Sequence, residues 1–269
     1  MATTTAKPRP WRATDHVRHA ARRQTASTNA HIAVRSDLIS RGLLIMIVLL
    51  GVADVVTQTT DATLSPTLPG WVQAVKLVDL DREFSFPTWY SIILLALASA
   101  LLGLISWAAR RDGDRLWIHW SILAVIFAAM SIDEQILGHE SVGQVVGEAL
   151  DTGGLINYAW VLPGTLVAGL LGLAFIPFLR AQRPPLRAAM ILAAGFYLGG
   201  ALGVEAVSGV VAEREGVASL LYASITSVEE TFELLGVSIF LLALLDEAGR
   251  RIPAFSISFE GRRQPHDAR

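Results

Sequence analysis

Long apolar stretches alternate with short polar ones along most of the chain. They cover residues 40–59, 89–109, 116–140, 159–180, 187–210 and 218–245. Each is long enough for a helix to cross the ~30 Å hydrocarbon core of a bilayer. Backbone polar groups must be satisfied internally in lipid, and the chain lacks the alternating pattern of a β-barrel. The pattern therefore predicts an all-α fold: an integral membrane bundle of six helices with the lipid bilayer as its surroundings.

Composition agrees with this prediction. The 269 residues are 52% hydrophobic and 17% charged, and the mean hydropathy is +0.48. These values are typical of multispanning membrane proteins rather than soluble globular ones. The chain contains no cysteine. A disulfide framework, a thiolate-ligated metal and a cysteine nucleophile are therefore excluded.

The distribution of Lys and Arg predicts the domain organisation and the orientation. Residues 1–37 form a basic tail, residues 38–248 the six-helix domain, and residues 249–269 a second basic tail. Both tails and the two Arg-rich turns between helices fall on one side of the membrane. The positive-inside rule then places both termini in the cytoplasm. We expect the first tail to lie on the anionic lipid surface rather than to bind nucleic acid.

The last apolar segment carries three acids near the middle of its length. They are Glu229, Glu230 and Glu233, and they share an arc of ~100° with Thr226 on a helix. Each ionised carboxylate at that depth costs roughly 2.5–3.5 kcal/mol on an insertion scale. Like charges so close together cannot all ionise. Some other group must therefore neutralise them.

Further acids fall in the same outer half of the predicted membrane domain. They are Asp54 on the first segment, Asp133, Glu134 and Glu140 beside His139 on the third, and Glu205 on the fifth. On a continuous helix Asp133 and Glu140 share a face, because they are seven residues apart, whereas Glu134 and His139 point elsewhere. We expect these acids to form one outward-facing layer with those of the last segment.

No Lys or Arg lies in the interior of a predicted segment, so ion pairs cannot neutralise the layer. The leading hypothesis is that Glu229, Glu230 and Glu233 bind a divalent cation. Five further residues would assist: Asp133, Glu134, His139, Glu140 and Glu205. An oxygen-rich set with one histidine suits Ca²⁺, Mg²⁺, Mn²⁺ or iron better than copper or zinc. The absence of a Glu-x-x-His motif weakens a di-iron interpretation.

Three alternatives stay open. The same carboxylates can serve a proton- or cation-coupled transporter or channel. They can instead be protonated and hydrogen-bonded to hydroxyl groups for structural reasons, the candidates being Ser121, Ser131, Thr226 and Ser227. The protein can also be an accessory subunit of a larger membrane complex. Whether it is an enzyme is left undecided, because no hydrolase motif is present.

The fifth segment repeats glycine at four-residue spacing, at Gly195, Gly199 and Gly203, with Gly200 beside them. Such spacing lets another helix approach the backbone closely. Packing inside the bundle is the favoured interpretation. A face for a second copy or for a partner in a membrane complex is the alternative.

Three stretches together support a resemblance. They read LDRE…PTWYS in residues 80–91, SIDE…HE in residues 131–140 and EETFELLG in residues 229–236. The chain resembles a family of bacterial polytopic membrane proteins with no known function. The resemblance implies that the acidic stretches form one recurring constellation. We expect the protein to lie in the bacterial inner membrane.

Overall fold

The computed structural model describes residues 36–64, 67–150 and 159–252, and all the regular structure in them is helical. The elements are α2 (Ser36–Leu64), α3 (Trp71–Val78), α4 (Phe86–Arg111), α5 (Trp117–Ile136), α6 (Gly138–Leu150), α7 (Val161–Ala181), α8 (Pro184–Leu198), the π-helix η3 (Gly199–Val204), α9 (Glu205–Glu215) and α10 (Leu220–Arg251). The all-α prediction is confirmed. The basic tails lie almost wholly outside the described residues.

Five helices of the described chain are long and apolar enough to span a membrane. They are Asp37–Leu64, Phe86–Arg111, Trp117–Ile136, Val161–Ala181 and Pro184–Glu215, the last comprising α8, η3 and α9 without a break. Helix α10 is as long, with 32 residues. It is not among these five, and it differs from them in carrying three glutamates in the middle of its apolar sequence. The protein therefore has the helices of a multi-pass membrane protein, while the count of six spans and the orientation of the termini stay predictions.

Local sequence explains where several helices begin and end. Ser85 precedes α4 and its hydroxyl accepts a hydrogen bond from the Thr88 N–H. Ser219 does the same for α10, with the Tyr222 N–H as donor. These hydroxyls satisfy amide groups that have no partner within the helix. Gly216 ends α9 with a φ of 81°, a value that glycine adopts without strain.

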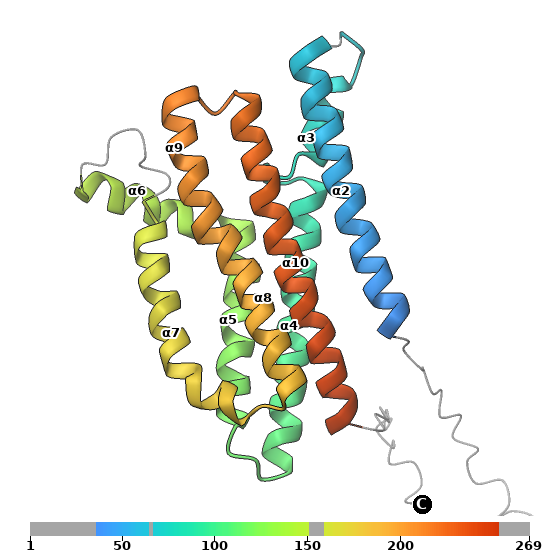
Figure 1. Cartoon of the computed structure of the whole chain (residues 1–269), viewed down its shortest axis with the longest axis vertical. Helices are drawn as coiled ribbons and strands as arrows, with labels where there is room; N and C mark the ends of the chain where they lie inside the picture. The colour runs from blue at the N-terminus through green and yellow to red at the C-terminus, as the bar shows by residue number, and fades with distance from the viewer. Residues whose placement is uncertain (1–35, 65–66, 151–158, 253–269) are drawn as a thin grey trace, which may run out of the picture. The chain divides into compact units, whose positions relative to one another are not determined.

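Helix α10 is the element against which most of the others pack. It runs beside α2, α4, α8 and η3, and Figure 1 shows it in red at the centre of the helices. Its Leu234, Leu241 and Leu244 are buried in one apolar cluster with Leu95 and Leu102 of α4, which are fully buried. In lipid such side chains hold helices together by van der Waals packing rather than by removal of apolar surface from water. The acids of α10 are thus held on a firmly packed helix.

Two glycines let α8, η3 and α10 approach one another closely. A Cβ atom on Gly236 would come within 2.7 Å of the Tyr197 nitrogen, and one on Gly200 within 2.8 Å of the Glu229 oxygen. The close approach predicted for this glycine-rich segment therefore exists, and Gly200 makes it. Of the glycines at four-residue spacing, an added Cβ on Gly199 would have a Phe232 ring carbon at 4.0 Å, and one on Gly195 or Gly203 would have no atom within 4 Å.

The predicted continuous helix over residues 116–140 is wrong. Helix α5 ends at Ile136, and Leu137 adopts a left-handed conformation with φ 55°. Helix α6 then begins at Gly138. A Cβ atom on Gly138 would lie 2.5 Å from Asp133 Oδ1, so any other residue there would displace the Asp133 carboxylate. Asp133 and Glu140 consequently lie on different helices and do not share a face.

An ion-pair network fixes the C-terminal end of α10. The buried Glu247 carboxylate forms ion pairs with two guanidinium groups: that of Arg183, which precedes α8, at 2.8 Å, and that of Arg251 at 2.6 Å. Arg251 also bonds Asp114, in the turn between α4 and α5, at 3.1 Å. Beside this network the rings of Trp120 and Phe178 meet edge to face at 4.9 Å. This end of the bundle is closed by paired charges and packed rings.

Candidate functional site

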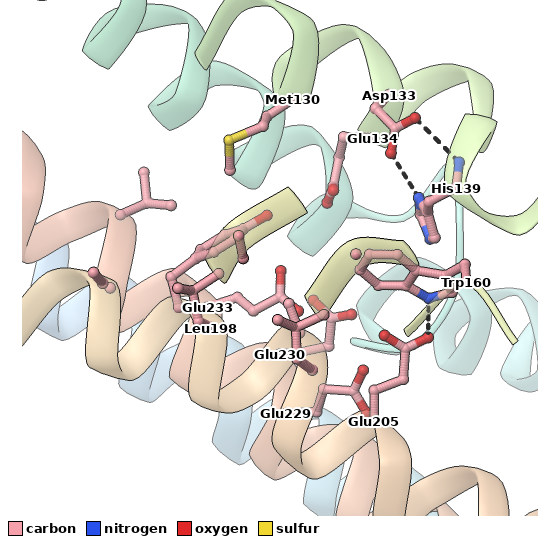
Figure 2. A pocket seen from close by; sticks show the side chains of 18 of the residues that line it. Met130, Asp133, Glu134, His139, Trp160, Leu198, Glu205, Glu229, Glu230 and Glu233 are labelled. Carbon is pink, nitrogen blue, oxygen red and sulfur yellow. Dashed lines mark hydrogen bonds and ion pairs between the residues drawn. The ribbon is translucent and has the colours of Figure 1, made fainter. Parts of the chain in front are cut away.

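A cavity of about 1180 Å³ lies among α5, α7, α8, η3, α9 and α10. Residues 80–83, between α3 and α4, line it as well. Helix α7 forms one wall and makes its closest backbone approach to η3. The acids gather in one part of the cavity, as Figure 2 shows.

Helix α10 contributes the acidic stripe that the sequence predicts. Thr226, Glu229, Glu230 and Glu233 all line the cavity. Glu229 is 9% exposed and accepts a hydrogen bond of 3.2 Å from the Ser208 hydroxyl on α9. Glu230 and Glu233 are more open to the cavity than Glu229. Two of the three acids thus present their carboxylates to the enclosed space.

Glu134 faces this stripe from α5, on the other side of the cavity (Figure 2). It lies within electrostatic range of both Glu230 and Glu233. The Tyr197 hydroxyl lies beside the Glu233 carboxylate. Carboxylates from two helices therefore converge without a Lys or Arg between them.

Asp133 and His139 form a pair at the turn between α5 and α6. The Asp133 carboxylate accepts a hydrogen bond of 3.1 Å from the His139 N–H, and its other oxygen lies 2.7 Å from the ring Nδ1. Asp133 therefore both caps the turn and orients the imidazole. This partnership leaves Glu134, rather than Asp133, to face the acids of α10.

Trp160 and Glu205 complete this part of the cavity. The indole Nε1–H donates a 2.6 Å hydrogen bond to Glu205 Oε1, and the ring meets the His139 ring edge to face at 5.1 Å. Glu205 is the first residue of α9, directly after η3. A π-turn rotates the residues that follow it relative to a regular helix. The π-helix thus helps to place Glu205 opposite Trp160.

Seven of the eight predicted site residues line the one cavity: Asp133, Glu134, His139, Glu205, Glu229, Glu230 and Glu233. Glu140 lies on α6, and the structure does not describe its side chain. Among the described residues, no group of three or more His, Asp or Glu side chains stands close enough to hold a metal ion. The metal-binding role of these residues stays a prediction.

Asp54 does not belong to the cavity. It is 1% exposed, and its carboxylate accepts hydrogen bonds from the Leu80 N–H and the Ser227 hydroxyl. It therefore ties α2 to the segment before α4 and to α10. Its charge acts on Asp79 and Asp81, so it lies near the other outer acids without lining the cavity. Ser227, proposed as a partner of the glutamates, serves Asp54 instead.

The acids at the mouth of the cavity precede α4. Desolvation raises the pKa of Asp81 to about 7, helped by the neighbouring charge of Asp79 and opposed by a hydrogen bond from Tyr222. Desolvation and the charge of Asp54 also raise the pKa of Asp79. Asp81 lines the cavity and is exposed by surface area. Its proton exchanges near neutral pH.

The sequence interpretation missed several residues of the site. Trp160, Tyr197 and Ser208 were not singled out, although all three line the cavity. A tryptophan at the start of a predicted span usually indicates an interfacial anchor. Ser208 lies three residues after Glu205, on a neighbouring face of the same helix, and this spacing was the one available signal.

One family model matches the chain, over residues 42–248. That range contains every described acid of the cavity and all but the ends of the helical domain. No curated protein and no solved structure matches. The family is consistent with the resemblance found in the acidic motifs. The chain belongs to the family described as a domain of unknown function, DUF8692.

Proposed function

We propose that the protein is a cation-coupled membrane carrier. Glu134, Glu230 and Glu233 would take up a proton or another cation in the acidic part of the cavity. The observation that carries this proposal is the pairing of these carboxylates with a cavity of about 1180 Å³. Pockets that enclose drug-sized ligands measure ~300–1,000 Å³, so the space suits a solute as well as an ion.

The cost of acids in a membrane domain supports the proposal. Intramembrane carboxylates are usually retained for ion or proton handling. Among the described residues that line the cavity, Arg82 at its mouth is the single Lys or Arg. It acts on Asp79, outside the acidic part. The three glutamates thus lack a fixed counter-charge, and exchangeable cations or protons can supply it.

The closed end of the bundle also fits a carrier. Glu247, Arg183 and Arg251 pair there, and Phe178 is 1% exposed. The acids and the ion-pair network thus lie in different parts of the bundle. A carrier needs such an arrangement, because the two ends must open alternately around one binding site.

The proposal is tested by proton flux in proteoliposomes under an imposed membrane potential. We expect flux in the wild type and its loss in Glu230→Gln. Glu213→Gln is the matched control, because Glu213 is exposed on α9 and lies outside the cavity lining. Flux no higher than in protein-free liposomes, or equal flux in Glu230→Gln, would contradict the proposal.

Binding of a divalent cation is the second candidate. The facing carboxylates of Glu134, Glu230 and Glu233 favour it, since oxygen ligands suit Ca²⁺, Mg²⁺, Mn²⁺ or iron. Helices α5 and α10 would have to approach each other for these carboxylates to coordinate one ion. Metal analysis of purified wild type and Glu230→Gln tests this candidate. Metal content near zero in both would rule it out.

Partners beyond the lipid bilayer are also proposed. Gly195 and Gly203 leave open space beside α8 and η3, and small residues favour helix association in lipid. A second copy or another membrane subunit would fit against this face. Native gels of the wild type and Gly195→Leu test it, and an unchanged assembly size would contradict it.

A further inference from the structure

The cavity has two chemically different parts. One part holds the carboxylates of Glu134, Glu230 and Glu233 (Figure 2). The other is apolar and aromatic, with Leu171 and Phe175 on α7 among its lining residues. A ligand that fills both parts must itself be polar at one end and apolar at the other.

The polar part selects for positive charge. No hydrogen bond from the described residues reaches the Glu230 carboxylate, and the charges that act on it are those of other acids. An anionic ligand would add a further negative charge to this group. A positively charged centre would instead remove the repulsion among three carboxylates at once.

Aromatic rings border the same acidic part. Trp160 is held in place by its hydrogen bond to Glu205, and Tyr197 lies beside Glu233. Aromatic faces attract cations by roughly 0.5–2 kcal/mol, more when water is excluded. Carboxylates together with indole and phenol rings suit an organic cation better than a strongly hydrated metal ion.

The apolar part can accept a hydrophobic body. The rings of Phe127 and Phe175 are half-buried and present apolar surface to the cavity. Each is backed by a buried ring, Phe127 by Phe240 at 4.8 Å and Phe175 by Phe178 at 5.6 Å. All four residues line the cavity. A metal ion or a proton would leave this apolar surface uncovered.

We infer that the cavity binds an amphipathic organic cation. Its positive centre would lie among Glu134, Glu230 and Glu233, and its apolar body against the phenylalanines of α5, α7 and α10. This inference rests on the proposed function and specifies the solute of that carrier. It needs no covalent step, since binding and release are electrostatic and hydrophobic.

Equilibrium binding to protein in lipid nanodiscs tests the inference. The probe is tetraphenylphosphonium, and its shape-matched anion tetraphenylborate is the chemical control. We expect saturable binding of the cation above that of empty nanodiscs and none of the anion. Glu230→Gln should weaken cation binding about tenfold, because a buried charge partner is lost. Glu213→Gln should leave it unchanged.

A second variant pair tests the apolar part. Gly172 lines the cavity, whereas Gly169 does not, and both lie on α7 with no atom within 4 Å of an added Cβ. Gly172→Phe should weaken tetraphenylphosphonium binding by filling the cavity, while Gly169→Phe should leave it unchanged. Equal binding in these two variants would contradict the proposed position of the ligand.

The outcomes separate this inference from the proposed function. If proton flux depends on Glu230 but tetraphenylphosphonium does not bind, the inference of an organic-cation ligand is wrong and the proposed carrier function stands. Binding of the cation without any flux would support the ligand class and overturn the carrier. Equal binding of the cation and the anion would overturn the inference.

Discussion

The Asp133 carboxylate holds His139 at two points, at 3.1 Å from the backbone nitrogen and at 2.7 Å from the ring Nδ1. The first contact starts α6, and the second turns the imidazole toward Trp160, 5.1 Å away between ring centroids. A single carboxylate thus sets both the fold of the α5–α6 turn and the wall of the cavity beside it.

Replacing Asp133 should loosen α6. Asp133→Ala removes the acceptor for the His139 N–H, and the loss of a helix cap costs roughly 0.5–2 kcal/mol. We expect faster hydrogen exchange of the amides of α6. Gln144→Ala is the control, because Gln144 is exposed on the same helix. Identical exchange in Asp133→Ala and the wild type would contradict the capping role.

The Glu247 network should contribute strongly to stability. Glu247 is 5% exposed and bonds two arginines, so Glu247→Ala leaves both without their main partner. We expect a loss of roughly 2–4 kcal/mol in the free energy of unfolding. Asp246→Asn removes an acid whose side chain is 59% exposed, and exposed pairs contribute ~0–1 kcal/mol. Thermal unfolding in detergent measures both, and equal effects would contradict the account.

Gly236 should be intolerant of a methyl group. Its Cβ would meet backbone atoms of Tyr197 and Ala193 at 2.7 and 2.8 Å, so α8 and α10 would have to separate. Overpacking of this kind costs roughly 1–3 kcal/mol. Gly195→Ala has open space and should be neutral or slightly stabilising. The prediction fails if the two variants unfold at the same temperature.

Asp81 should make stability depend on pH. Its pKa is raised to about 7 in the folded protein, first by desolvation and then by the charge of Asp79, and is ~3.9 in an unfolded chain. The folded state therefore holds this proton more tightly. As pH rises from about 4 to 7, the unfolded state ionises first, and the contribution of Asp81 to stability falls. Above pH 7 the contribution is constant.

Asp81→Asn removes this titration. The unfolding temperature of the variant should therefore rise relative to that of the wild type between pH 5 and pH 8. Asp246→Asn is the control: the hydrogen bond from Arg250 lowers the pKa of Asp246, so any effect of its titration lies below pH 4. A difference between Asp81→Asn and the wild type that does not change with pH would contradict the account.

Much of the fold follows from the sequence, because the length of an apolar stretch reports directly on the helix that it forms in a membrane. The segment 89–109 lies within α4, and 218–245 lies almost wholly within α10. The acidic stripe of α10 was also predictable. Helical spacing alone puts Thr226, Glu229 and Glu233 on one side.

The rest depends on contacts between distant residues. The break at Leu137 needs the Asp133 carboxylate and the space that Gly138 leaves, and neither is visible in an apolar pattern. Asp54 resembles the other acids in its sequence context. Its carboxylate nevertheless accepts hydrogen bonds from the Leu80 N–H and the Ser227 hydroxyl and does not line the cavity. The cavity itself depends on how far α7 stands from its neighbours, which periodicity does not report.

The central claim is that the carboxylates of the cavity couple cations to a solute. The most direct test measures uptake of ethidium, an aromatic organic cation that crosses bilayers only slowly unaided, in proteoliposomes under a pH gradient, with the membrane potential held at zero. We predict accumulation against the concentration gradient in the wild type and in Glu213→Gln, and none in Glu230→Gln. Equal distribution of the cation across the membrane in all three would contradict the account.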